Sequence, residues 1–120
     1  MNRLLIVDDA LIMRMKIKEI AVQAGWTVVA EATNGEEAIA LYEKHLPELV
    51  TLDMIMPKMD GLMALKTIRD YNPQAQVVMV SAVDQKEKLK DCIMNGAMDF
   101  IVKPFDSDRL LAFFERYRKD

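Results

Sequence analysis

The sequence predicts an α/β fold in which five strands alternate with five helices and form a doubly wound parallel sheet. Three observations lead to this prediction. Short apolar runs recur along the chain without polar interruption, as is typical of strands buried on both faces of a parallel sheet. Segments with apolar residues at helical spacing separate these runs. Turn and capping residues mark the boundaries, so right-handed crossovers should cover both faces of the sheet.

The first part of the chain is expected to hold two strands and two helices. A strand at residues 3–7 leads into a helix that Gly25 ends, and a second strand follows at residues 27–30. Asn34 suits the N-cap of the second helix, because Glu37 lies three residues later as in a capping box. The residues expected to be buried are Met13, Ile17, Ile20, Ala21 and Ala24 in the first helix, and Ala38, Leu41 and Tyr42 in the second.

The central strand is expected at residues 49–52, where a short apolar run ends in turn chemistry. The turn residues Asp60 and Gly61 then start a third helix, which Asn72 and Pro73 end. The inward face of this helix should carry Leu62, Leu65 and Ile68.

The last part of the chain is expected to add strands at residues 76–80 and 99–102. Between them, a helix from about residue 85 to residue 95 ends at Gly96, which suits a C-cap. A last helix begins near Asp106 or Ser107. The inward residues of these two helices should be Leu89, Cys92, Ile93, Leu110, Phe114 and Tyr117, while Lys86, Lys88 and Lys90 face solvent.

Composition narrows the class of protein. The chain has 120 residues, a formal net charge of -3, 52% hydrophobic and 29% charged residues, which suits one domain over residues 1–120. No basic cluster dominates a face, so direct contact with nucleic acid is not expected. The single cysteine, Cys92, excludes a disulfide framework and a thiolate metal cage. No run approaches membrane-spanning length, so we expect a cytoplasmic protein without membrane contact.

Four strand ends are expected to bring polar side chains to one edge of the sheet. Asp8 and Asp9 follow the first strand, Asp53 follows the third, and Ser81 and Lys103 follow the fourth and fifth. Ligands of open α/β sheets bind beyond the carboxyl ends of the strands, so a functional site is expected there. Each carboxylate could also serve as a helix or turn cap, but their repetition over several strands favours a site.

The three carboxylates require a compensating cation. Without one they would repel each other and hold protons more tightly, so a hard divalent metal is expected. Mg²⁺ is the best candidate, because it takes one or two carboxylates, a backbone carbonyl and a phosphate oxygen while keeping several waters. A lysine and a hydroxyl beside the metal suit a phosphoryl group. Asp53 is then the nucleophile that forms an aspartyl phosphate.

Four separated motifs resemble the receiver domain of two-component response regulators over essentially the whole chain. These motifs are Val7-Asp8-Asp9, Leu52-Asp53 to Pro57 with Asp60-Gly61, Val80-Ser81-Ala82 and Lys103-Pro104-Phe105. Within the family, the continuation Asp8-Asp9-Ala10 into Met13-Arg14, the segment 32–35 and the length look most like stand-alone chemotaxis regulators of the CheY-like type. The resemblance implies the flavodoxin-like strand order 2-1-3-4-5.

The resemblance also implies how the site works. A sensor histidine kinase would phosphorylate Asp53 from a phosphohistidine in a reaction that depends on Mg²⁺. Asp9 and Asp53 would bind the metal directly, Asp8 largely through water, and the backbone carbonyl of Ile55 would complete the protein ligands. Lys103 would pair with the phosphoryl group across a cis bond to the following proline.

The resemblance further implies a switch with several partners. Ser81 would move toward the phosphoryl oxygen and let Phe100 turn inward, although family members often carry tyrosine at this aromatic position. The surface of the fourth helix, fifth strand and fifth helix would then bind a downstream target, such as the flagellar switch. The chain would be a monomer. It would not be an enzyme, because it catalyses only its own phosphorylation and dephosphorylation.

Two positions that influence hydrolysis of the acyl phosphate in this family are occupied by Ile55 and Val83. Neither side chain can hold the attacking water. We therefore expect slow self-dephosphorylation and a separate phosphatase.

Three other interpretations stay open at this point. A receiver excised from a longer transcription factor or hybrid kinase would have the same sequence. An aspartyl-phosphate phosphatase of the dehalogenase type shares the nucleophile and Mg²⁺, but it places a second acid where this chain has Ile55. A flavodoxin would bind a flavin phosphate in the first loop, where Asp8 and Asp9 would repel it.

Overall fold

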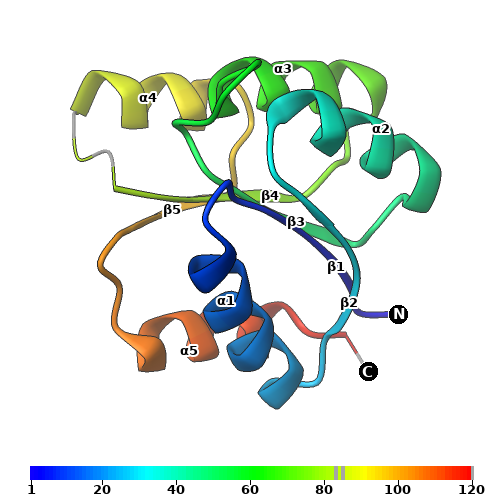
Figure 1. The fold of residues 1–120 in the computed structure, drawn as a ribbon, viewed down its shortest axis with the longest axis vertical. Coiled ribbons are helices and arrows are strands. Elements are labelled where there is room, and N and C mark those ends of the chain that lie inside the picture. The colour runs from blue at the N-terminus through cyan, green and yellow to red at the C-terminus, as the bar shows by residue number, and fades with distance from the viewer. Residues whose placement is uncertain (83, 85, 120) are drawn as a thin grey trace.

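Strands and helices alternate along the whole chain (Figure 1). The structure, a computed structural model, describes residues 1–82, 84 and 86–119. Within these residues, parallel strands form one sheet in the order β2-β1-β3-β4-β5. The elements are β1 (Arg3–Val7), α1 (Leu11–Gln23), β2 (Thr27–Ala32), α2 (Gly35–His45), β3 (Leu49–Leu52), α3 (Gly61–Tyr71), β4 (Val77–Ser81), α4 (Lys86–Met94), β5 (Asp99–Val102) and α5 (Ser107–Tyr117). The predicted fold class and strand order are confirmed.

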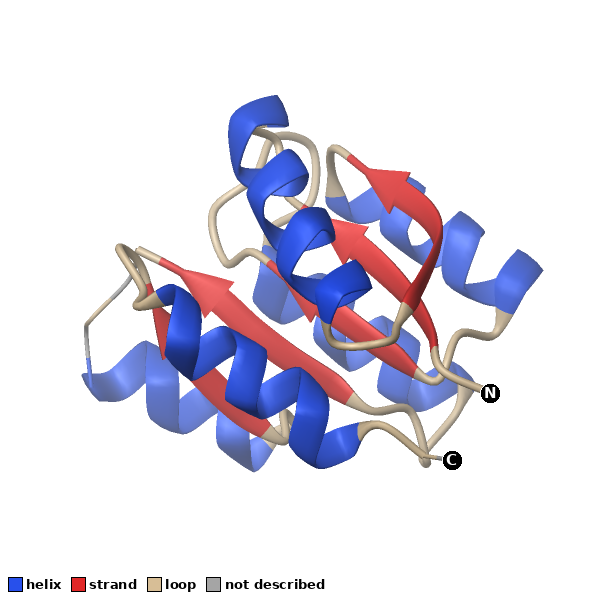
Figure 2. Cartoon of the chain, turned by 90° about the horizontal axis from the view of Figure 1, so that it is seen from below, coloured by secondary structure: helices blue, strands red, loops and turns tan. Residues whose placement is uncertain are grey.

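Helices cover both faces of the sheet. α1 and α5 pack on the face seen in Figure 2, and α2, α3 and α4 pack on the opposite face. In β1, Leu4 and Ile6 join the core on the α1 and α5 side, whereas Leu5 and Val7 join the core on the other side. Because successive side chains of a strand point to opposite faces, a strand covered on both sides must be apolar throughout. No helix in the described ranges is long and apolar enough to cross a membrane.

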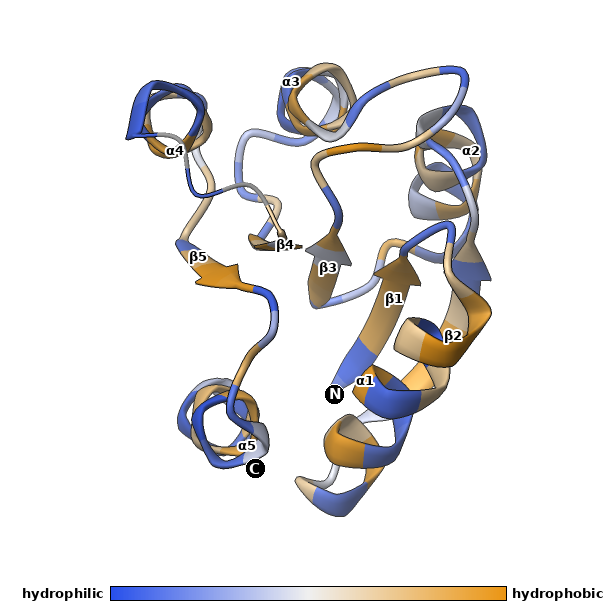
Figure 3. Ribbon diagram, turned by 60° about the vertical axis from the view of Figure 1, so that its left-hand side comes forward, coloured by the Kyte–Doolittle hydropathy of each residue, from blue (hydrophilic) through white to orange (hydrophobic). Residues whose placement is uncertain are grey.

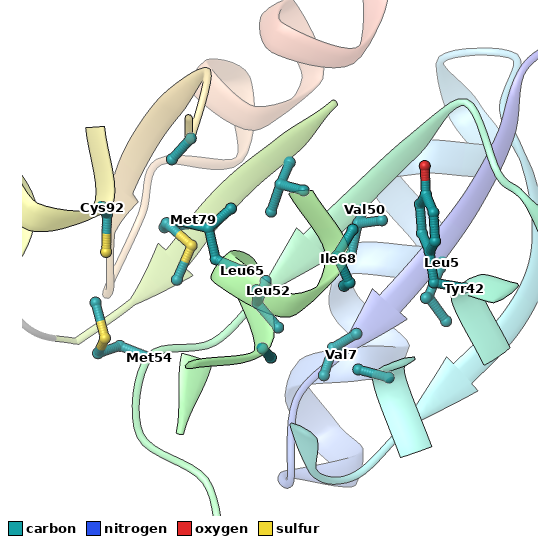
Figure 4. Close-up of a cluster of buried hydrophobic side chains, with 14 of the residues drawn as sticks. Leu5, Val7, Tyr42, Val50, Leu52, Met54, Leu65, Ile68, Met79 and Cys92 are labelled. Carbon is teal, nitrogen blue, oxygen red and sulfur yellow. The ribbon is translucent and has the colours of Figure 1, made fainter. Parts of the chain in front are cut away.

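The second core, between the sheet and α2 to α4, is shown in Figure 4. One predicted inward residue is wrong, because the side chain of Ile93 is 48% exposed. α4 turns Cys92 into the core, and the next residue lies about 100° further round the helix and faces solvent. Five other predicted core residues are half-buried against the two cores, namely Met13, Leu41, Leu62, Leu89 and Tyr117. The burial of Phe113 on α5 was not predicted.

Most predicted boundaries lie within two residues of the observed ones. β2 extends to Ala32, because Ile6 and Val7 of β1 pair with its last residues. Asn34 caps α2 by accepting from the Glu37 N–H at 2.9 Å, as predicted. The predicted start of the fourth helix, residue 85, lies outside the described residues. Hydrophilic and apolar stretches alternate along the helices (Figure 3), and α1 also exposes the apolar residues Leu11, Ile12, Met15 and Val22.

Candidate functional site

The polar residues predicted at the strand ends do gather at the carboxyl edge of the sheet, namely Asp8, Asp9, Asp53, Ser81 and Lys103. Backbone pairing aligns the strand ends there. The Asp53 N–H donates to the Val7 carbonyl at 3.0 Å, and the Lys103 N–H donates to the Ser81 carbonyl at 2.9 Å. The sequence places these residues together because parallel strands present their carboxyl ends at one edge.

Lys103 provides the positive charge of this cluster. Its Nζ lies 2.5 Å from Oδ2 of Asp8 and 3.5 Å from Oδ2 of Asp53. The other carboxylate oxygen of Asp8 accepts a hydrogen bond from the Ala10 N–H at 2.9 Å. Both oxygens of this buried carboxylate are therefore engaged by protein donors, whereas Asp9 is exposed to solvent. The peptide bond between Lys103 and Pro104 is cis, as the resemblance implied.

Asp53 is a buried carboxylate, and its pKa is raised above the ordinary range. The main cause is burial, which removes the charged form from water, and the like charge of Asp8 adds to it. Contacts with Lys103, the Ser81 hydroxyl and the Ile55 N–H favour the ionised form but do not outweigh the burial. Burial therefore dominates the behaviour of this carboxylate, and a cation bound beside it would favour the ionised form.

The three carboxylates fit a divalent cation. One oxygen from each of Asp8, Asp9 and Asp53 lies within 4.8 Å of the others. Carboxylate oxygens are the ligands that Mg²⁺ prefers, and the set has no nitrogen or sulfur donor that would favour a softer metal. The site therefore has the chemistry of a Mg²⁺ site.

Gly61 lets the loop after Asp53 fold against the site. A Cβ atom at Gly61 would overlap the carbonyl oxygen of Asp53, and the Gly61 N–H donates to the Met54 carbonyl at 2.7 Å. Only a residue without a side chain allows this approach. Asp60 then caps α3 by accepting from the Met63 N–H.

The residues assigned to switching and hydrolysis have different surroundings. Ser81 is buried beside Asp53, and its hydroxyl hydrogen bonds to that carboxylate. Phe100 is buried in the core on the α2 to α4 side, so it occupies the inward position in this structure. Ile55 is 62% exposed beside Asp53. Val83 lies outside the described residues.

The sequence predicted no role in the site for one residue that lies beside it. Arg14, in the first turn of α1, donates from Nη1 to the backbone carbonyl of Asp8 at 2.7 Å. A cation near a helix N-terminus opposes the helix dipole, so an arginine there needs another stabilising contact. This mismatch is the signal in the sequence that could have identified it.

The parallel sheet with Asp8, Asp9 and Asp53 at its carboxyl edge is the arrangement expected of a receiver domain. Residues 4–115 match the model of the response regulator receiver domain, and the chain belongs to this family.

Relatives narrow the assignment within the family. The chain is 54% identical over 110 residues to chemotaxis protein CheY of Bacillus subtilis, covering 92% of each chain. It is 50% identical over 119 residues to CheY of Listeria monocytogenes, covering 99% of this chain and all of the relative. A solved CheX–CheY–BeF₃–Mg²⁺ complex from Borrelia burgdorferi contains a chain that matches with a TM-score of 0.92 and 36% identity, over 98% of this chain and 90% of the other.

This protein is therefore a CheY-like response regulator. It is a phosphoacceptor switch of the receiver class, and its acidic site consists of Asp8, Asp9 and Asp53. The three carboxylates have the chemistry of a Mg²⁺ site, and the solved B. burgdorferi complex contains Mg²⁺.

Proposed function

We propose that this chain carries a chemotaxis signal by accepting a phosphoryl group on Asp53 from the phosphohistidine of a sensor kinase. The observation that carries the proposal is the position of Asp53 within 3.5 Å of the Lys103 ammonium, at the edge where the carboxylates converge. The likeness to chemotaxis proteins named CheY supports the pathway. Phosphorylation then changes the surface that a target protein binds.

The transfer follows from the groups around Asp53. A carboxylate oxygen of Asp53 attacks phosphorus, the bond from phosphorus to the imidazole nitrogen breaks, and the imidazole keeps the electron pair and takes a proton from solvent. Lys103 neutralises charge on a phosphoryl oxygen, and the Ser81 hydroxyl donates to another. When bound, Mg²⁺ supplies further charge neutralisation.

The proposed ligands differ in how they reach the metal. Asp9, Asp53 and the backbone carbonyl of Ile55 would hold Mg²⁺ directly. Asp8 would act largely through water, which agrees with the engagement of its two oxygens by Lys103 and the Ala10 N–H. These assignments come from the resemblance to receivers and are consistent with the contacts.

The proposed switch runs from Ser81 to β5. Ser81 pairs with Val102 in the sheet, and its carbonyl accepts the Lys103 N–H. A shift of Ser81 toward a phosphoryl oxygen would therefore pull on β5, the strand that carries Phe100. The surface of α4, β5 and α5 is the proposed readout, because its packing depends on that strand.

The proposed partners are a sensor histidine kinase, a downstream target such as the flagellar switch, and a separate phosphatase. The solved complex of the B. burgdorferi CheY with CheX supports the idea that a further protein binds a receiver of this type. We place the protein in the cytoplasm as a monomer, with residues 1–120 as one receiver domain and no direct contact with nucleic acid or membrane.

Acetyl phosphate tests the phosphoacceptor directly. The protein is incubated with it, with and without Mg²⁺, and the intact mass is measured. The wild type should gain one phosphoryl group only with Mg²⁺, and Asp53→Asn should gain none. Asp60→Asn is a matched control, because it also removes one carboxylate from the loop after β3 while asparagine still caps α3. This variant should gain one phosphoryl group, as the wild type does. A gain of one phosphoryl group by Asp53→Asn would overturn the proposal.

Phosphotransfer tests the pathway. A chemotaxis kinase labelled on histidine should transfer its phosphoryl group to the wild type faster than an unrelated sensor kinase does. Equal rates from both kinases would contradict the chemotaxis assignment while leaving the phosphoacceptor assignment intact.

A further inference from the structure

Arg14 links the acidic site to the neighbouring strand. Its Nη1 donates to the Asp8 carbonyl at 2.7 Å, and its Nε donates to Oε1 of Glu31, in β2, at 3.1 Å. Only 12% of the Arg14 side chain is exposed. The guanidinium is thus held from two directions, and its planar fork fixes both contacts at once.

The carbonyl that Arg14 contacts belongs to the peptide unit between Asp8 and Asp9. Orienting that peptide therefore sets where the backbone carries Asp9, whose carboxylate is exposed to solvent. The start of α1 offers little help, because Ala10 is its N-cap and makes no side-chain capping hydrogen bond. The loop is instead held by the Asp8 side chain at the Ala10 N–H and by Arg14 at the Asp8 carbonyl.

We infer that Arg14 is a positioning residue for the metal site, which fixes the Asp8–Asp9 peptide so that Asp9 meets the cation in the correct place. The inference rests on the proposed function, because it takes Asp9 as a direct Mg²⁺ ligand. Groups that orient metal ligands from the outer shell commonly change metal affinity by 10-fold to 100-fold, roughly, when they are removed. Arg14 reaches its ligand through the backbone rather than through a side chain.

The charge of Arg14 and its contact with the Asp8 carbonyl should affect Mg²⁺ affinity in opposite directions. A guanidinium near the carboxylates repels a divalent cation, so removing the charge alone would tighten Mg²⁺ binding. Loss of the Asp8 carbonyl contact loosens the loop and would weaken Mg²⁺ binding. The two effects can therefore be separated by the sign of the change in affinity.

The test uses Arg14→Met, which removes both charge and donors, and Arg14→Lys, which keeps the charge but lacks the two-donor fork. Lys18→Met is the matched control, because Lys18 lies on the same helix and also pairs with Glu31, at 3.9 Å, while 53% of its side chain is exposed. Mg²⁺ affinity is measured by isothermal titration calorimetry at a temperature where circular dichroism shows every variant folded. The rate of phosphorylation by acetyl phosphate is then measured across Mg²⁺ concentrations.

Arg14→Met should weaken Mg²⁺ binding about tenfold, with Arg14→Lys between it and the wild type and Lys18→Met unchanged. The Mg²⁺ concentration for half-maximal phosphorylation should rise by the same factor, while the rate at saturating Mg²⁺ stays near that of the wild type. Unchanged or tighter binding by Arg14→Met, in a wild type that binds Mg²⁺ and is phosphorylated, would overturn this inference alone. A wild type that binds no Mg²⁺ would overturn the proposed function.

Discussion

Lys103 lies closer to Asp8 than to the carboxylate that we propose is phosphorylated. Its ammonium is 2.5 Å from Asp8 and 3.5 Å from Asp53. The lysine therefore neutralises the carboxylate that supports the metal site as well as the nucleophile. In this arrangement Lys103 and Mg²⁺ compete for the same negative charge, and a phosphoryl group on Asp53 offers the lysine a new partner.

Replacing Lys103 should have opposite effects on metal binding and on phosphorylation. Lys103→Met should bind Mg²⁺ roughly tenfold more tightly, because the loss of a neighbouring cation removes a repulsion of the order of 1 kcal/mol. Phosphorylation by acetyl phosphate should slow about 100-fold, since a donor to the developing charge is lost. Calorimetry and the rate of mass gain measure the two effects. Lys44→Met, an exposed change on α2, is the control, and weaker Mg²⁺ binding by Lys103→Met would contradict the argument.

Asp53→Asn should stabilise the metal-free protein at neutral pH. Burial raises the pKa of Asp53 above 3.8, so its protonated form favours folding. The stabilisation by protonated Asp53 is fully present below pH 3.8 and is lost as pH rises through the pKa that Asp53 has in the folded protein. Urea unfolding in EDTA should show a higher free energy for the variant at pH 7, and the difference should vanish as pH falls toward 3.8. Asp70→Asn, an exposed change on α3, should show no such trend, and a gain for Asp53→Asn that grew in acid would refute this account.

The positions of the site residues could be predicted because they depend only on the sheet. Once short apolar runs are recognised as buried parallel strands, the residues after them must meet at one edge. Asp8, Asp53 and Lys103 were identified in this way without any knowledge of side-chain conformation. The same reasoning gave the bounds of β1, β3 and β5.

Contacts within the site could not be predicted, because they depend on side-chain conformations and helix rotation. Nothing in the sequence ranks Asp8 above Asp53 as the nearer partner of Lys103. The contact between Arg14 and the Asp8 carbonyl requires the first turn of α1 to face β2. The exposure of Ile93 depends on how α4 is rotated about its axis, which apolar spacing over so short a helix does not fix.

Gly61→Ala should damage both the fold and the site. The added Cβ would meet the carbonyl oxygen of Asp53 and the backbone at Met54, neither of which can rotate away as a flexible side chain can. We expect a loss of about 3 kcal/mol in the free energy of unfolding, as for an overpacked core position. Urea unfolding gives this value, and Mg²⁺-dependent phosphorylation should fall as well. The control is Ser107→Ala, a change to alanine at the first residue of α5, as Gly61 is the first residue of α3. If Ser107→Ala lowered the free energy of unfolding as much as Gly61→Ala, the change at the helix start and not the packing against Asp53 would explain the loss.

The lifetime of the phosphorylated form should depend on Ile55. This side chain is 62% exposed, and its backbone N–H donates to Asp53 Oδ1 at 3.4 Å, so it borders the bond that water must attack. An aliphatic group there cannot orient the attacking water, whereas an asparagine amide can. Ile55→Asn should therefore shorten the lifetime of the phosphorylated form about tenfold. This factor is small compared with the rate increase that full orientation of two reacting groups can give. Decay of the phosphorylated mass after removal of acetyl phosphate measures it.

The control for Ile55→Asn is Ile93→Asn, the same change at an exposed position on α4. Its phosphorylated form should decay at the wild-type rate, because Ile93 lies on α4 and does not border the Asp53 carboxylate. If the wild-type phosphoprotein lasted only seconds, or if Ile55→Asn decayed no faster than it, the attacking water would not need a polar side chain at this position. Hydrolysis would then be limited by another feature of the site, and the reason for expecting a separate phosphatase would be removed.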